Sequence, residues 1–409
     1  MKLLKVDTVE EAKNKMDHHF SGIYLNEIEI DTYQGLGRVL AEDHYAPFDL
    51  PEFHRSTVDG YALWSQDTFG VSDSLPVFLQ CVGNVEMGEK TSLKVSTGKA
   101  VYVPTGGMIP AGADGVVMIE YVEILDSHTI AVHRPVAPGD GMVLKGEDLK
   151  KDSLFLKKGR KIKPQDVGAL AAVGINRIKV LEKPKVAILS TGDEIVSPEE
   201  EVSFGKIRDI NTYTLSAMAE ELGWEVTFKA VVKDEYGLLI NTLKPLIGQN
   251  HMVIISGGSS VGTKDVTAKV IDELGDPGVF VHGVAVKPGK PTIIGKAGNT
   301  ALFGLPGHPV SAMIVFKIFV EYLSQSLTKQ ELHKELVLQA LADTNIHSSP
   351  GKETYQMVVL ETVNDTYIAK SIHGKSGAIS LMTRAQGYIK IDTNKEGVKK
   401  GEKVKVYLL

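Results

Sequence analysis

The sequence holds one cysteine, Cys81, among its 409 residues. A lone cysteine can form neither an intrachain disulfide nor a cluster of thiolates around a metal. The twelve histidines show no ligand spacing such as H-E-x-x-H, which argues against a zinc or non-haem iron site. The cysteine content therefore fits a reducing compartment and excludes metal centres held by several thiolates.

The chain also lacks a long hydrophobic run and an excess of basic residues. Its longest apolar run, Ala312–Phe316, is broken by Lys317 and is too short to span a bilayer. Residues 1–8 lack the apolar core of a signal peptide. The net charge of −6 argues against general nucleic-acid binding. We therefore expect a cytoplasmic protein with no membrane and no nucleic-acid partner.

The common nucleotide-binding motifs are missing as well, and Ser190 and Ser256 do not lie in a serine-hydrolase motif. No G-x-x-x-x-G-K-[ST] occurs, and no G-x-G-x-x-G follows a strand pattern, so P-loop and dinucleotide-binding folds have no support. Ser190 and Ser256 lie in Ser-Thr-Gly and Ser-Gly-Gly sequences rather than in G-x-S-x-G elbows. The sequence therefore gives little support to a serine hydrolase.

The length of the chain and its pattern of apolar runs and turn residues predict a multidomain α+β fold. A length of 409 residues predicts two to four domains. Residues 46–144 carry short apolar runs between turn residues, typical of a β-barrel-like module, which is inserted into a mixed linking domain of residues 1–45 plus 145–182. Residues 183–328 alternate strands and helices, which predicts an α/β domain with a mostly parallel sheet. Strand patterns return in residues 329–409 and predict a C-terminal all-β domain.

Four polar loops follow the predicted strands of the α/β domain. They are residues 190–194, Asp234, residues 256–262 and residues 304–311. Ligands bind at the carboxyl ends of the strands in such sheets. A buried strand, Met252–Ile255, that runs into serines and glycines before a helix presents backbone N–H groups suited to phosphate. These loops therefore predict an anion site at one edge of the sheet.

Charged residues near these loops suggest the partners of that anion. Asp193, Glu194, Asp234 and Asp265 could converge at the strand ends, and carboxylates beside a phosphate imply a divalent cation, with Mg²⁺ the natural candidate. As individual residues they could instead cap helices. Lys287 and Lys290 flank Pro288-Gly289 and could share one anion, or they could form an ordinary solvated turn.

Other polar stretches have simpler interpretations by themselves. His308, in Leu-Pro-Gly-His-Pro, is better explained as a turn residue than as a base or ligand. Asp59-Gly60 and Thr105-Gly-Gly107 in the inserted module likewise resemble turns.

Taken together, the motifs resemble the molybdopterin molybdenumtransferase family, which comprises the MoeA proteins and the E domain of gephyrin. The matching segments run in family order over nearly the whole chain. They are residues 51–62, 105–114, 146–148, 190–194, 207–211, 256–262 with Asp265, 287–291 and 305–309. The resemblance implies an elongated homodimer that transfers molybdenum from molybdate to adenylylated molybdopterin, releases AMP and requires Mg²⁺. Its active site would lie between the α/β domain of one subunit and the β module of the other.

The resemblance also assigns roles, and it revises the interpretation of Asp59 and Thr105 as simple turns. The expected catalytic residues are Asp59, Asp148, Glu194, Asp234, Asp265, Lys287 and Lys290, and Glu194, Asp234 and Asp265 are the expected Mg²⁺ ligands. The two lysines would hold the molybdate oxyanion. The expected substrate-binding residues are Thr105, Ser190, Thr191, Gly192, Ser256, Gly257, Gly258, Ser259, Gly262, Pro306, Gly307, Pro309, Ser311 and Ser376.

The chain departs from the family pattern in its C-terminal domain. Gly351-Lys-Glu-Thr-Tyr-Gln-Met357 has methionine where family members often carry an arginine, so a bidentate guanidinium is missing there. Gly283 and His308 also differ from residues common in the family. Two alternatives remain, a non-catalytic scaffold on the same fold and a molybdopterin adenylyltransferase. The adenylyltransferase and other proteins of the cofactor pathway are the expected partners.

Overall fold

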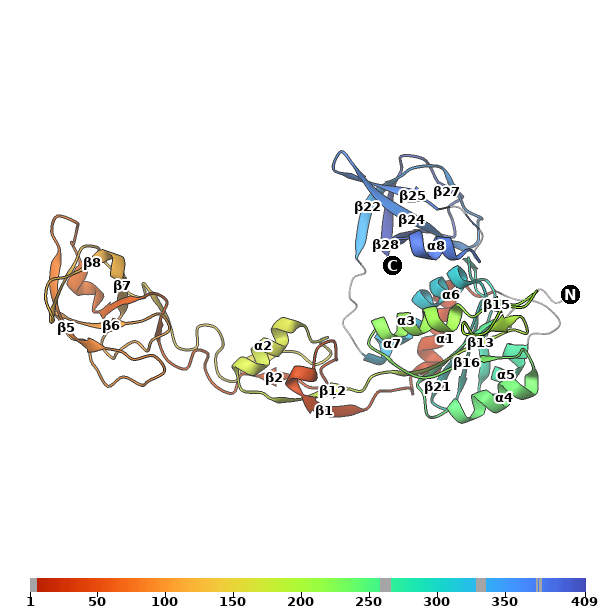
Figure 1. Cartoon of the computed structure of the whole chain (residues 1–409), viewed down its shortest axis with the longest axis horizontal. Helices are drawn as coiled ribbons and strands as arrows, with labels where there is room; N and C mark the ends of the chain where they lie inside the picture. Colours follow the sequence, from red (N-terminus) through yellow and green to blue (C-terminus); the bar gives the residue numbers. More distant parts are fainter. Residues whose placement is uncertain (1–5, 258–265, 329–335, 373, 375–376) are drawn as a thin grey trace.

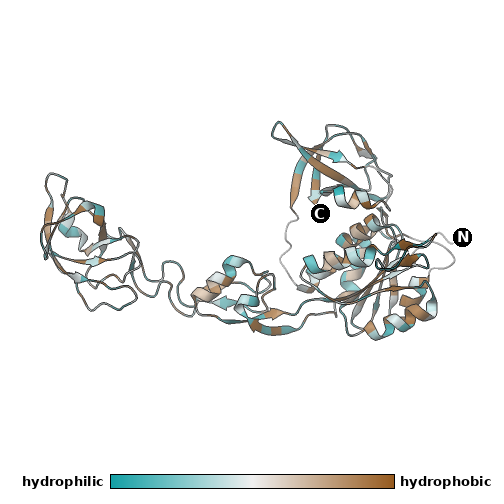
Figure 2. Ribbon diagram, viewed as in Figure 1, coloured by the Kyte–Doolittle hydropathy of each residue, from teal (hydrophilic) through white to brown (hydrophobic). Residues whose placement is uncertain are grey.

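A computed structural model describes residues 6–257, 266–328, 336–372, 374 and 377–409. The chain is elongated (Figure 1), with the inserted module at one end, the linking domain in the middle, and the α/β and C-terminal domains together at the other end. Hydrophobic residues line the strands of each domain (Figure 2), so each has its own core.

Two chain passages build the linking domain. Strand β1 (Glu27–Asp31) pairs antiparallel with β12 (Arg177–Leu181), and β2 (His44–Tyr45) pairs with β11 (Leu154–Leu156). Helix α2 (Pro164–Ala172) begins with proline at its first turn, where the missing N–H costs nothing. A small apolar core that includes Leu40, Leu170 and Ile178 holds the two passages together.

The inserted module is a curled six-stranded sheet (Figure 1) with strand order β7-β4-β6-β5-β9-β8. Alternate residues of its strands fill two apolar clusters, one around Leu63 and Ile130 and one around Val101 and Val116. The strands of this sheet are β4 (Gly60–Leu63), β5 (Val77–Asn84), β6 (Lys99–Val103), β7 (Gly115–Met118), β8 (Val122–Ile124) and β9 (Thr129–Val132). Two further short strands, β3 (Arg55–Ser56) and β10 (Met142–Val143), pair with each other.

The α/β domain is built on a second six-stranded sheet, of order β16-β13-β17-β21-β20-β18. The first four strands run parallel, β20 is antiparallel, and β18 returns to the direction of β21. The prediction of a mostly parallel sheet is confirmed. The strands are β13 (Lys185–Thr191), β16 (Glu225–Val232), β17 (Met252–Gly257), β18 (Gly278–His282), β20 (Ile293–Ala297) and β21 (Thr300–Leu305).

Both faces of this sheet are buried, which explains the continuous apolar strands. Along β13, Val186 and Ile188 pack on one face and Ala187 and Leu189 on the other. Helices α4 (Tyr236–Leu243) and α5 (Val266–Leu274) supply core residues on the second face, and α3 (Asn211–Glu221) and α6 (Pro309–Val315) supply them on the first. A short π-helix (Phe316–Val320) joins α6 to α7 (Glu321–Thr328).

The N-terminal helix α1 (Val9–Phe20) packs on the α/β domain. Thr8 caps it in a capping box with Glu11, as its sequence pattern predicts. Its apolar stripe, which includes Met16 and Phe20, joins the core of the first sheet face. The predicted boundary groups residues 1–45 with the linking domain. Helix α1, within that range, packs its apolar stripe against the α/β domain.

The C-terminal domain is a five-stranded barrel, closed in the pairing order β24-β25-β22-β28-β26-β24. Its strands are β22 (Val337–Ala342), β24 (Glu353–Val363), β25 (Thr366–Ser371), β26 (Gly387–Ile391) and β28 (Lys403–Leu408), with a short pair of β23 (Ile346–His347) and β27 (Gly397–Val398). It also contains one short helix, α8 (Ile379–Arg384).

The barrel docks on the α/β domain through a two-residue strand and an apolar contact. Strand β19 (Val286–Lys287) pairs with the start of β24 at Glu353 and Thr354. Tyr355, Met357 and Leu381 of the barrel belong to the same apolar cluster as the first face of the α/β sheet. The two domains therefore share a continuous core.

One helical stretch, Pro309–Thr328, is long and apolar enough to cross a membrane by length and composition. However, 67% of its apolar window is buried inside the protein. The apolar character of this stretch is explained by its place in the core of the α/β domain.

Candidate functional site

The predicted polar residues lie opposite one another at the carboxyl ends of three parallel strands. Ser190 of β13 lies opposite Ser256 of β17, and Thr191 lies opposite Gly257. Ser256 in turn lies opposite Leu305, the last residue of β21. The sheet thus places the ends of these strands side by side, as the sequence predicted.

Asp209, just before α3, and Thr212, in its first turn, close over this edge. The Ser190 hydroxyl donates to Oδ1 of Asp209 at 2.6 Å and lies 2.8 Å from the hydroxyl of Thr212. The backbone N–H of Thr212 donates to the same carboxylate oxygen at 3.2 Å. All three residues are buried, so these hydrogen bonds fix the end of β13 against the start of α3.

Asn211 makes a second connection from the same helix turn. Its Nδ2 donates to the hydroxyl of Ser256 at 2.7 Å and to the carbonyl of Gly307 at 2.8 Å. The Ser256 hydroxyl donates in turn to the carbonyl of Pro306 at 3.1 Å. The residues that follow β21 are therefore tied to the end of β17, and buried Pro309 and Ser311 begin helix α6 beside them.

Gly257 shows why this edge needs a glycine. Its φ is +108°, and a Cβ there would lie 2.0 Å from the carbonyl oxygen of Thr191. A side chain would therefore clash with neighbouring backbone as well as strain its own. The glycine permits the close approach of β17 to β13 at the point where the chain leaves the sheet.

Two polar atoms at this edge have no hydrogen-bond partner among the described residues. They are Oγ1 of Thr191 and Oδ1 of Asn211, and both residues are more than nine-tenths buried. A buried polar atom without a partner costs about 1–3 kcal/mol. Such atoms in a folded protein call for an explanation, and they occur here beside the predicted substrate edge.

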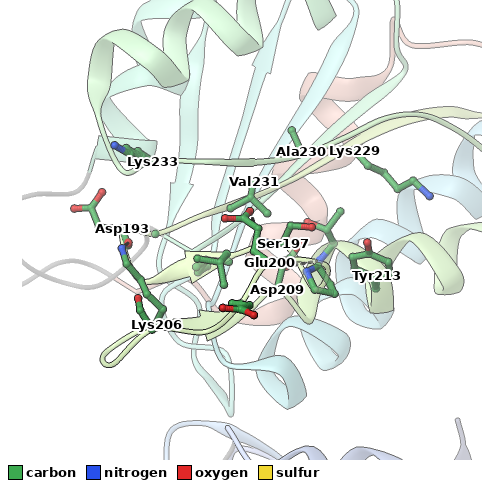
Figure 3. A pocket seen from close by; sticks show the side chains of 17 residues that line it. Asp193, Ser197, Glu200, Lys206, Asp209, Tyr213, Lys229, Ala230, Val231 and Lys233 are labelled. Carbon is green, nitrogen blue, oxygen red and sulfur yellow. Dashed lines mark hydrogen bonds between the residues drawn. The ribbon is translucent and has the colours of Figure 1, made fainter.

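A cavity of about 700 Å³ opens beside these strand ends. It extends from Gly192 and Asp193 across the edge strand β16 and is bounded by the β14–β15 segment, with β14 at Ile195–Val196 and β15 at Ile207–Arg208. In Figure 3, Lys206 and Lys233 lie at the same end as Asp193, and Tyr213 lies at the opposite end. The cavity thus offers two ammonium groups close to the strand ends and a partly apolar interior.

The predicted Mg²⁺ ligands lie in adjacent loops. Glu194 follows β13, with its Oε2 only 2.9 Å from the Cβ position of Gly192, and half-buried Asp234 follows the neighbouring strand β16. The third predicted ligand, Asp265, lies outside the described residues. Within the described part of the chain, no group of three His, Cys, Asp or Glu residues could hold a metal ion.

The lysine loop lies at the same edge of the sheet. It connects β18 to β20, and because β18 runs parallel to β21, this connection leaves the sheet at the carboxyl edge. Lys287 and Lys290 are both exposed. A second cavity, of about 510 Å³, lies where Lys287 meets the C-terminal barrel. Met357, only 4% exposed, is part of its wall.

The inserted module lies at the end of the elongated molecule opposite the α/β domain (Figure 1). The backbone N–H of Thr105 donates to Oδ1 of Asp59 at 2.8 Å, so these two exposed residues form one unit. Asp148 is exposed near Leu50, where the chain leaves the module. Within one subunit the structure does not bring these three residues to the sheet edge.

Some predicted site residues are not described by the structure, and some residues that organise the site were not predicted. Gly258, Ser259, Gly262, Asp265 and Ser376 lie outside the described residues. Conversely, the prediction gave no role to Asp209, Asn211 and Thr212, which organise the edge. The signal was the segment Ile207–Asn211, a polar run directly before a helix, which the family comparison matched without assigning it a task.

Family models cover most of the chain. Residues 7–174 match the MoeA N-terminal region (domain I and II), residues 187–325 match a probable molybdopterin binding domain, and residues 339–409 match the MoeA C-terminal region (domain IV). The three matches follow one another without overlap and divide the chain near the borders of its folded units.

Relatives with known names match along nearly their whole length. A putative molybdopterin biosynthesis protein of Methanocaldococcus jannaschii is 35% identical over 93% of this chain and 92% of its own. A molybdopterin molybdenumtransferase of Staphylococcus aureus is 30% identical over 93% of this chain and 91% of its own. A crystal structure of a molybdopterin biosynthesis MoeA protein from Pyrococcus horikoshii, 38% identical, superposes with a TM-score of 0.85 over 99% of both chains.

Proposed function

The chain belongs to the MoeA family and acts as a transferase in molybdenum cofactor biosynthesis, and from this premise we propose that it transfers molybdenum from molybdate to adenylylated molybdopterin with release of AMP. One observation carries the proposal. The hydroxyl and glycine network of Ser190, Ser256 and Gly257 lies at the carboxyl ends of parallel strands, beside a cavity lined by three lysines. Such an edge suits the phosphates of a pterin nucleotide.

The expected work of the protein is positioning and charge stabilisation. In the reaction, a phosphoanhydride bond is cleaved and oxygen ligands of molybdenum are replaced by two sulfur ligands. Lys206 and Lys233 would attract the phosphates in the first cavity, and Lys287 and Lys290 would attract the molybdate oxyanion at the other end of the edge. Holding both reactants on one rigid sheet edge makes the encounter intramolecular.

Mg²⁺ is part of this proposal. Glu194 and Asp234 fit it because they are oxygen ligands in adjacent post-strand loops at the phosphate edge. Mg²⁺ commonly takes one or two carboxylates together with phosphate oxygens and water. Bound there, it would neutralise phosphate charge, and the two carboxylates would set its position.

A homodimer completes the proposal. Asp59, Thr105 and Asp148 lie in or beside the inserted module, remote from the α/β edge of their own subunit (Figure 1). A twofold pairing of two elongated chains would let each module reach the other subunit's edge. We place the enzyme in the cytoplasm, where it would receive its substrate from the adenylyltransferase of the same pathway.

The direct test is an incubation of the purified protein with adenylylated molybdopterin, Mg²⁺ and sodium molybdate. AMP release that depends on molybdate, together with formation of molybdenum cofactor, is the expected result. Absence of molybdate-dependent AMP release would refute the proposed reaction. Omission of Mg²⁺ in a parallel sample tests the metal requirement separately.

A further inference from the structure

The cavity between the lysine loop and the C-terminal barrel is short of positive charge. Among the described residues that line it, Lys287 is the one with a permanent positive charge. A large part of the wall is apolar, formed by Val310, Ile346, Met357, Ile372 and Leu381. One ammonium can meet only part of the hydrogen-bonding demand of a dianionic tetrahedral oxyanion that leaves water. Neutral side chains among the described residues of the wall can therefore supply hydrogen bonds that Lys287 does not make.

Two of the polar side chains in the wall are already committed. Nε2 of Gln356 donates to the backbone carbonyls of Met357 at 3.1 Å and Ile372 at 2.8 Å, so its donor end is turned away. The hydroxyl of buried Thr354 lies 2.8 Å from that of Ser348. Because both side chains already have hydrogen-bond partners, neither is well placed to be the main donor to an anion.

Asn345 is set up differently. Its Oδ1 accepts the backbone N–H of Lys400 at 2.8 Å. Because a backbone N–H can only donate, this bond fixes the oxygen of the carboxamide toward Lys400. The Nδ2 end, with its two N–H donors, is then the end that can serve the cavity that Asn345 lines. The neighbouring pair of β23 and β27 anchors this stretch of backbone.

We propose that Asn345 is an oxyanion-binding residue that works with Lys287 in this cavity. The identity of the anion as molybdate rests on the proposed function, whereas the donor assignment rests on the Lys400 contact and the position of Asn345 in the wall. A fixed neutral amide supplies directional hydrogen bonds without a second charge beside the apolar face at Met357. The volume of about 510 Å³ leaves room for further ligand atoms beside the anion.

The test uses Asn345→Asp in the full-length protein. This change keeps the oxygen that accepts the Lys400 N–H, but it replaces the two donors with a negatively charged acceptor. Isothermal titration with sodium molybdate, and separately with sodium tungstate, measures affinity without turnover. Asn394→Asp is the matched control, because it adds the same charge at an exposed site of the same domain that does not line the cavity.

We expect Asn345→Asp to weaken oxyanion binding at least about tenfold, the scale of a lost hydrogen bond to a charged group, and Asn394→Asp to stay within about twofold of wild type. Wild-type affinity in Asn345→Asp would overturn the inference and leave the proposed function intact. Absence of any oxyanion binding by the wild type would instead overturn the inference together with the molybdate part of the proposed function. If Asn345→Asp does not fold, Asn345→Ser, which removes the amide donors without adding charge, gives the same comparison.

Discussion

Nδ2 of Asn211 donates to the hydroxyl of Ser256 at 2.7 Å and thereby ties the first turn of α3 to the end of β17. The same amide holds the carbonyl of Gly307, so one side chain joins a helix start to two post-strand turns. The geometry of the proposed phosphate edge therefore depends on a residue from a helix as well as on the strands.

Replacing Asn211 by alanine should loosen this edge. The hydroxyl of Ser256 and the carbonyl of Gly307 would lose a buried partner, which should lower the free energy of unfolding by about 1–3 kcal/mol. Urea denaturation measures this loss, and Asn394→Ala should change it by no more than about 0.5 kcal/mol. We also expect a higher KM for adenylylated molybdopterin. A variant with wild-type stability and KM would show that the bridge is dispensable.

Gly257 and Gly168 form a matched pair of glycine substitutions. Gly257→Ala would force a Cβ against the Thr191 carbonyl at positive φ, and it should cost more than about 3 kcal/mol or prevent soluble expression. Gly168 lies in α2 with open space around its Cβ position, so Gly168→Ala should stabilise the protein by about 0.5–1 kcal/mol. Thermal melting measures the stability of both variants. Equal changes in melting temperature for Gly257→Ala and Gly168→Ala would contradict the prediction.

A site shared between subunits can be tested by complementation. Asp59→Asn and Lys287→Ala homodimers should each have little turnover. Heterodimers of the two variants should contain one intact site, so random pairing after co-expression predicts about a quarter of wild-type activity. Size-exclusion chromatography confirms that dimers form in every sample. If the mixture stays as inactive as the parents, both residues serve the same site within one chain.

The linking domain should lose stability in acid through Asp166. Burial alone would raise its pKa, but two hydrogen bonds of 2.9 Å from Arg160 and one from the Lys163 N–H outweigh this and lower the pKa of Asp166. A lowered folded-state pKa gives stabilisation that is present above the unfolded value of about 3.9 and is lost as the pH falls through the folded value.

Asp166→Asn should therefore destabilise the protein by about 1–3 kcal/mol at pH 7, and the difference from wild type should shrink below about pH 4. Chemical denaturation at pH 7, 5 and 3.5 follows this change. Glu10→Gln, on the exposed face of α1, is a control that should show no comparable pH dependence. A difference that is constant with pH would mean that the carboxylate charge is not responsible.

The sequence predicted which strands end at the edge of the sheet, but not which helix residues close over that edge. The carboxyl ends of β13, β17 and β21 do lie side by side, because apolar runs between polar turns fix strand positions and parallel pairing fixes the edge. The roles of Asp209, Asn211 and Thr212 could not be predicted, since hydrophobic periodicity places a helix but does not reveal which turn closes over a neighbouring loop.

The same limit applies to the cavity at the barrel. Lys287 could be singled out from its loop sequence, but Asn345 is 58 positions further along the chain (345 − 287) and carries no motif. Only the pairing of β19 with β24 brings the two residues to one wall. Contacts between domains of this kind are absent from local sequence patterns.

The packing of α1 on the α/β domain has a consequence for the order of events during synthesis. Lys15 contacts the carbonyl of Phe280, and the hydroxyl of Tyr322 donates to Asp17, so α1 finds these partners 265 and 305 residues further along the chain. Until then the apolar residues of α1 stay without their packing partners while the linking domain and the inserted module emerge from the ribosome. The α/β core is thus completed only after the chain has been synthesised past Tyr322, and chaperone protection would matter most before that point.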